Sequence, residues 1–165
     1  MKILTKEMTT CLYNRSHNNK FDFLCNRLEH SIGCTYVTYL IEKDNRKYFF
    51  SSKEDWQQEL FNNKLINKCP IYKYAFEALS LTGENNIFTI WDYVPHKKGE
   101  EQDLLCFRSS FNIAHGIGIA IAHKDMRESI VFAGHRDDKN FHNKVLNSNH
   151  INECLDIFRS STLFI

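Results

Sequence analysis

The sequence lacks any apolar run long enough to cross a membrane. Its longest apolar stretch, GIGIAIA at residues 116–122, has the length of a strand, whereas a membrane-spanning helix needs about 20 such residues. The opening residues, MKILTKEMTTCLYNR, hold no apolar segment of the length found in secretory signals. We therefore expect a cytoplasmic protein that does not associate with membranes.

The sequence also lacks an excess of charge of either sign. It has 21 basic and 20 acidic residues, and its formal net charge is +1. Domains that bind nucleic acid usually carry a basic patch or stripe, which this balance does not suggest. We expect no direct nucleic-acid binding by this chain.

The signatures of metal and cofactor sites are missing as well. Gly116 and Gly118 form a G-x-G inside an expected strand, without the third glycine and the following helix of a phosphate-binding loop. None of the six cysteines forms a C-x-x-C pair, and no Cys/His group has zinc-finger spacing. Histidines in the C-terminal half would have to converge with Asp137 or Asp138 to bind a metal; the candidates are His115, His123, His135 and His142. We expect neither a metal nor a cofactor.

What the sequence does contain is typical of one folded domain. Hydrophobic residues make up 42% and aromatic residues 13% of 165 residues, which is too apolar for a disordered chain. A chain of this length buries a sizeable core. We interpret the cysteines as reduced and mostly buried small hydrophobes.

Apolar periodicity predicts an alternation of helices and strands. Residues 21–30 have the spacing of an amphipathic helix, and residues 34–41 and 47–51 are rich in the β-branched and aromatic residues of a hairpin. The further expected elements are a helix from about Ser52 to Cys69, a helix from Pro70 to a loop at 83–86, a strand at 87–94, a helix at 104–113, strands at 116–122 and 129–133, and a helix at 145–158.

This order predicts an α+β fold. We expect an α-β-α sandwich, with an about five-stranded, mainly antiparallel sheet and helices on both faces, as in PAS and GAF domains. Residues 1–20 are expected to form an N-terminal arm or a short helix before a domain at 21–165. Glycine and alanine alternate with isoleucine at 116–122, which leaves room on one sheet face for a helix or a ligand.

Three motifs resemble the autoinducer-binding domain of LuxR-type quorum-sensing regulators. Trp56 stands thirteen positions before the pair Cys69-Pro70, where that family has Asp-Pro. Trp91 lies in an aromatic strand, and residues 112–120, NIAHGIGIA, match a glycine-containing family signature. The resemblance extends from about residue 21 to the end. It implies a non-enzymatic, small-molecule-sensing regulatory domain that forms dimers.

Carried over residue by residue, the resemblance implies that the polar side chains facing the ligand's head group differ from those of the family. Trp56 keeps the indole N–H that the family donates to a lactone carbonyl. Cys69 replaces the family's aspartate with a weak acceptor, which would cost roughly 1–3 kcal/mol with an acyl-lactone amide. We therefore expect a small amphiphile other than a standard N-acyl homoserine lactone. The candidate ligand-binding residues are Trp56, Leu60, Phe61, Cys69, Tyr72, Trp91 and Gly118.

Each of these residues also has a structural interpretation. Trp56 is an equally good core anchor at a helix start, Trp91 is a packing residue, and Cys69 is more simply an inert buried cysteine than a reactive thiol. Two alternative functions stay open. One is a partner protein that binds no ligand and forms a homodimer or a heterodimer with a related regulator. The other, which we regard as inferior, is a thiol enzyme that pairs Cys69 or Cys106 with His115. The family's C-terminal helix-turn-helix is not expected within this chain.

Overall fold

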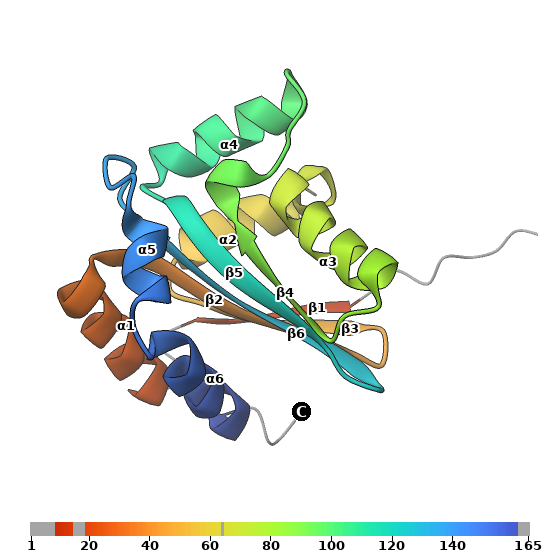
Figure 1. Cartoon of the computed structure of the whole chain (residues 1–165), viewed down its shortest axis with the longest axis horizontal. Coiled ribbons are helices and arrows are strands. Elements are labelled where there is room, and N and C mark those ends of the chain that lie inside the picture. The colour runs from red at the N-terminus through yellow and green to blue at the C-terminus, as the bar shows by residue number, and fades with distance from the viewer. Residues whose placement is uncertain (1–8, 15–18, 64, 162–165) are drawn as a thin grey trace, which may run out of the picture.

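The computed structural model describes residues 9–14, 19–63 and 65–161, which form one α+β unit (Figure 1). The strands are β1 (Thr9–Asn14), β2 (Cys34–Lys43), β3 (Arg46–Ser51), β4 (Asn86–Ile90), β5 (Ala114–Ala122) and β6 (Met126–Gly134). The α-helices are α1 (Asn19–Ile32), α2 (Glu54–Asn62), α3 (Pro70–Thr82), α4 (Glu100–Ser110), α5 (Phe141–Leu146) and α6 (His150–Ser161), and two 3-10 turns are η2 (Leu65–Lys68) and η3 (Trp91–Tyr93). Within these ranges no helix is long and apolar enough to span a bilayer.

The described strands form one six-stranded sheet in the order β1-β3-β2-β6-β5-β4. All neighbours are antiparallel except β1 and β3, which run parallel. The two-residue turn between β2 and β3 places Asp44 and Asn45 at φ values of 52° and 61°. Asp and Asn tolerate this left-handed conformation, and such turns match the twist of paired strands.

Helices cover both faces of the sheet, so the expected α-β-α sandwich is confirmed (Figure 1). Along β2, Val37, Tyr39 and Ile41 face the core shared with α1, α5 and α6. Tyr36 and Leu40 on the same strand point to the opposite face, where they join two apolar clusters with α2, α3 and α4. This alternation is the period of two that any β-strand imposes. It gives the two faces separate cores.

Several local expectations were wrong. The stretch at 9–14 is strand β1 rather than part of an arm or a short helix, although the division of the chain at residue 20 stays a prediction. The strand expected at 87–94 ends at Ile90, and Trp91 begins the turn η3. The expected loop before the last helix contains α5, whose Phe141 packs directly on Gly134.

A buried carboxylate joins α6 to the sheet. Glu128 on β6 is completely buried and accepts hydrogen bonds from Tyr39, from His123 at 2.9 Å and from Arg159 Nε at 3.0 Å. Burial by itself raises the pKa of this carboxyl. The bonds from Arg159, Tyr39 and His123 together outweigh burial and hold the pKa of Glu128 below its usual value.

Replacing Glu128 by Gln should therefore destabilise the fold in a pH-dependent way. The carboxylate contributes fully above its unfolded-state pKa of about 4.3, and this contribution is lost as pH falls through the lower folded-state pKa. At neutral pH we expect a loss of roughly 1.5–3 kcal/mol in the free energy of unfolding, as for hydrogen bonds to charged groups. Urea unfolding between pH 3 and 7 measures the loss, which should shrink below about pH 4.

Glu153→Gln is the matched control, because Glu153 forms an exposed ion pair with Arg27. Solvent screens such a pair, so this variant should change stability much less. A Glu128→Gln deficit that stays constant with pH would contradict the assignment.

Candidate functional site

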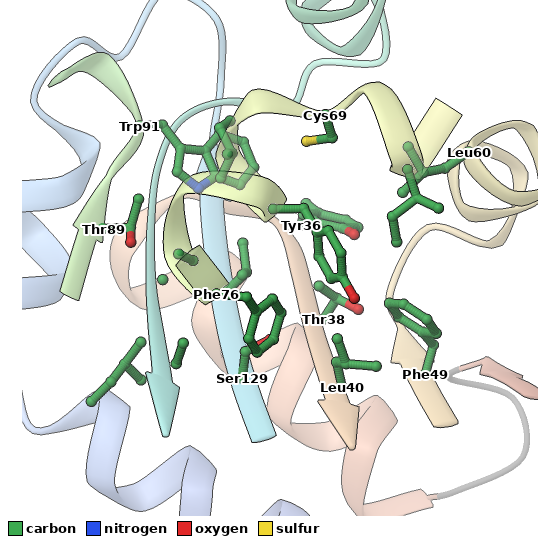
Figure 2. Close-up of a pocket in the computed structure, with 18 of the residues that line it drawn as sticks. Tyr36, Thr38, Leu40, Phe49, Leu60, Cys69, Phe76, Thr89, Trp91 and Ser129 are labelled. Atoms are coloured by element: carbon green, nitrogen blue, oxygen red, sulfur yellow. The ribbon is translucent and has the colours of Figure 1, made fainter. Parts of the chain in front are cut away.

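A buried cavity lies between the sheet and the helices α2, α3 and α4 (Figure 2). Its volume is about 80 Å³, several times the roughly 10–15 Å³ that one water molecule needs on the same measure. Most of its wall is apolar; this part comprises Leu40, Phe49, Leu60, Ile66, Ile71, Ala75, Phe76, Ala120 and Val131. An apolar cavity with a few placed polar groups is the usual form of a small-molecule site.

The room for this cavity comes from small side chains on two central strands. Gly118 and Ala120 on β5 line the cavity beside Ser129 on β6. The side chains that alternate with them and point to the opposite face of β5 and β6 are large. They include Ile117, Ile130 and Phe132, which belong to the other core. The sheet is therefore densely packed on the face toward α1, α5 and α6, and it leaves space on the face toward α2, α3 and α4.

The most unusual group in the wall is the guanidinium of Arg108, on α4. The residue is only 6% exposed, and Nη2 donates a hydrogen bond to Cys69 Sγ at 3.1 Å. Its Cζ lies over the rings of Trp56 and Trp91, at 5.3 and 5.1 Å from the ring centroids. Nη1 is buried and has no hydrogen-bond partner within the described part of the chain.

Three more buried polar atoms that lack a partner among the described residues belong to the same cavity wall. They are Gln57 Nε2, Thr89 Oγ1 and Trp91 Nε1. The other end of the Gln57 amide is fixed, since Oε1 accepts the Tyr36 hydroxyl at 2.7 Å. Figure 2 shows Trp91, Thr89, Tyr36 and Cys69 grouped on one side of the cavity. Buried polar atoms normally find partners, so four such atoms on the residues of one cavity wall, all without partners in the described ranges, are unusual.

A second polar cluster lies farther along β2 and is complete in itself. Glu42 is buried and accepts hydrogen bonds from Tyr72 and from Arg127, with Arg127 Nε at 3.0 Å. Lys47 Nζ lies 3.4 Å from the same carboxylate. Burial raises the pKa of Glu42, but Tyr72, Arg127 and Lys47 outweigh it, and the net pKa is lowered. This carboxylate is thus neutralised by its own neighbours and not by Arg108.

Most of the residues proposed from the sequence lie at this cavity. Leu60, Cys69, Tyr72, Trp91 and Gly118 line it, whereas Trp56 and Phe61 do not. Trp56 is fully buried and packs against Phe107 and Phe111, with ring centroids 5.7 and 5.3 Å away. Phe61 packs on Phe49 at 4.6 Å. The ligand roles of all seven stay predictions.

Sequence reasoning missed Gln57, Thr89 and Arg108. Helix α4 begins four residues before the helix expected at 104–113, and it buries Leu104 and Arg108. The i, i+4 spacing of Leu104 and Arg108 was the available signal. An arginine in a helix is usually solvated, which is why the signal was overlooked.

The contacts of His115 do not support the thiol-enzyme hypothesis. Its Nδ1 lies 3.0 Å from the Asp92 carboxylate and its Nε2 lies 2.9 Å from the Arg136 carbonyl oxygen, so both ring nitrogens are engaged. Cys69 pairs with Arg108, and a nucleophilic cysteine needs an adjacent base. In the ranges that the structure describes, no three His, Cys, Asp or Glu side chains converge on a possible metal position.

Fold and site together define an α-β-α sandwich with an internal cavity on one side of its sheet. Among solved structures, SdiA of Escherichia coli is similar, with a TM-score of 0.52 and 11% identity over 84% of this chain and 60% of SdiA. SdiA in complex with octanoyl-rac-glycerol gives 0.54 and 10%, over 86% of this chain and 60% of that one. CepR2 of Burkholderia cenocepacia, an N-acylhomoserine lactone dependent LuxR family transcription factor, gives 0.52 and 10%, over 88% and 90%.

These similarities establish the fold. The chain spans 60% of the length of SdiA. No protein-family model and no curated protein sequence matches it.

The position of Trp91 depends on Gly116, which gives a testable consequence. A Cβ atom at Gly116 would lie 2.5 Å from Cδ2 of the Trp91 indole. Gly116→Ala should displace the ring and lower the free energy of unfolding by roughly 1–3 kcal/mol, as overpacking does. Chemical denaturation followed by circular dichroism measures this loss.

Gly118→Ala in the same strand is the control, because its Cβ would meet only Val131 Cγ2, at 3.1 Å, and the Ile130 carbonyl oxygen, at 3.4 Å. Its loss should be the smaller of the two. Equal stability of the two variants would show that the contact between Gly116 and Trp91 does not constrain the fold.

Proposed function

We propose that this chain is a small-molecule-sensing regulatory domain whose cavity under α2, α3 and α4 binds a small amphiphile. The observation that carries the proposal is the division of the cavity wall. One end presents four buried polar atoms without partners in the described ranges, from Gln57, Thr89, Trp91 and Arg108. Most of the remaining wall is apolar, so a ligand with a polar head and an apolar tail matches both parts.

The shared fold supports the sensing role. SdiA has been crystallised with octanoyl-rac-glycerol, an acyl glycerol, and CepR2 is a transcription factor that depends on N-acylhomoserine lactone. We infer for the present chain a role of the same general kind, in which ligand binding controls a regulatory partner. A homodimer or a heterodimer with a related regulator is the corresponding assembly.

Contacts of Cys69 support a ligand other than a standard N-acyl homoserine lactone. Its sulfur already accepts a hydrogen bond from Arg108 at 3.1 Å. An acyl-lactone amide placed here would meet a weak, engaged acceptor beside a positive charge that repels its N–H dipole. The ligand head that fits this end carries acceptors rather than a donor.

The alternative of a partner protein that binds no ligand is less well supported. That function requires no cavity, and filling one stabilises a core by restoring lost packing contacts. The cavity beside Arg108 is thus a feature that a purely structural role leaves unexplained.

Native mass spectrometry tests the sensing function directly. Freshly purified protein, with and without added acyl homoserine lactones, acyl glycerols and fatty acids, should give a one-to-one adduct with at least one class. Ala75→Leu narrows the cavity from α3, so it should weaken the adduct by tenfold or more if the added atoms fill ligand space. Circular dichroism checks that the variant is folded.

Ala78→Leu adds the same atoms to α3 but lies outside the cavity wall, so it should leave the adduct unchanged. If no compound class gives an adduct at micromolar concentration, the sensing function is wrong and the partner-protein alternative replaces it. If Ala75→Leu and Ala78→Leu weaken the adduct equally, the ligand binds elsewhere on the protein.

A further inference from the structure

The charge of Arg108 is the least compensated buried charge in the described part of the chain. The two buried carboxylates among the described residues are each paired with cations: Glu42 with Arg127 and Lys47, and Glu128 with Arg159. For Arg108, no carboxylate of a described residue forms an ion pair, and its only side-chain hydrogen-bond acceptor there is the Cys69 sulfur. An arginine stays protonated in proteins, and burying a charge without a partner of opposite sign is strongly unfavourable.

The two tryptophans hold this guanidinium without using its N–H donors. Cation–π contacts place its Cζ 5.3 Å from the ring centroid of Trp56 and 5.1 Å from that of Trp91. The N–H donors lie in the plane and point outward from it. Nη2 is used by Cys69, and Nη1 is buried without a partner in the described part of the chain. The guanidinium is thus held in place, but not all of its N–H donors have an acceptor.

The neighbouring atoms add donors to the same end of the cavity. Trp91 Nε1 is a donor only, Gln57 Nε2 is an amide donor, and Thr89 Oγ1 can donate its proton. A carboxylate offers two oxygens with about four acceptor positions and a negative charge. A neutral lactone or ester supplies acceptors but leaves the charge of Arg108 uncompensated. Anions satisfy both the donors and the charge.

We propose that the cavity selects amphiphiles with a carboxylate head, and that Arg108 binds this carboxylate. The proposal rests on the small-molecule-sensing function above and names its ligand class. The head lies against Arg108, Trp91 and Thr89, and the apolar tail extends along Leu40, Phe49 and Phe76. Fatty acids and N-acyl amino acids, including acyl homoserines with an open lactone ring, both have a carboxylate head and an apolar tail.

A matched pair of probes separates charge from shape. Octanoate and octanamide have the same chain and nearly the same head size, but only octanoate is anionic at neutral pH. Isothermal titration calorimetry with the whole chain should give octanoate an affinity at least tenfold higher than octanamide, since a hydrogen bond to a charged group is stronger by that order. Octanoyl-homoserine and its lactone form a second pair, which differs in charge and also in ring closure; tight binding of octanoyl-homoserine would identify acyl amino acids as the source.

Arg108→Met removes the charge and retains an unbranched apolar side chain. We expect it to lower the octanoate affinity by roughly 10- to 100-fold and to abolish the preference over octanamide. Because the ligand-free protein then buries no unpaired charge, its thermal midpoint should be equal or higher. Arg108→Lys keeps the charge without the planar guanidinium, so it should retain part of the preference for octanoate over octanamide. It replaces Arg108→Met in the test if the methionine variant does not fold.

Lys68→Met is the control for net charge, since Lys68 forms an exposed pair with Glu100 at 3.1 Å, away from the cavity. It should leave both affinities unchanged. If octanamide or the lactone binds as well as its anionic counterpart, or if both Arg108 variants retain the full preference, the carboxylate proposal is wrong while the sensing function stands. If neither pair binds and no other amphiphile forms an adduct, the sensing function itself fails.

Discussion

The packing of one sheet face against α1, α5 and α6 is the constraint on which the cavity depends. That face carries the large residues, with Tyr39 stacked on Phe158 at 4.8 Å and Phe21 in contact with Phe158 at 5.3 Å. A domain retains only a small net stability after conformational entropy is subtracted. Dense packing on one face therefore allows the other face to keep the smaller side chains of β5. One side of the single sheet is therefore densely packed, and the other lines the cavity.

The buried charges on the two faces of the sheet also differ in how they are paired. On the dense side, Glu128 is enclosed by Arg159, Tyr39 and His123, and its bonds fasten α6 to the sheet. On the cavity side, Glu42 is held by its own cations. Arg108 differs because aromatic rings and a cysteine sulfur surround it instead of an anion. Local deviations from the rule of paired buried charges tend to mark functional positions.

Much of this architecture follows from local pattern in the sequence. The β-branched and aromatic residues of β2, the alternation of small residues with isoleucine in β5 and the proline that opens α3 were sufficient to predict the sandwich and the room on one face of its sheet. Strand β1 was missed because TTCLYN is short and mixes polar with apolar residues without a clear alternation; it pairs only with β3, at the edge of the described sheet. Arg108 was missed because periodicity cannot tell a buried cation from a solvated one; that depends on which side chains from α2 and η3 surround it.

The contact between Gly116 and Trp91 also limits how this protein can diverge. The indole occupies the space where any side chain at position 116 would begin, so the two positions share one volume. A larger residue on β5 is acceptable only together with a smaller ring on η3, and such pairs are energetically coupled. A change at position 116 is therefore least costly when the ring at position 91 has already become smaller, which favours one order of mutation over the other.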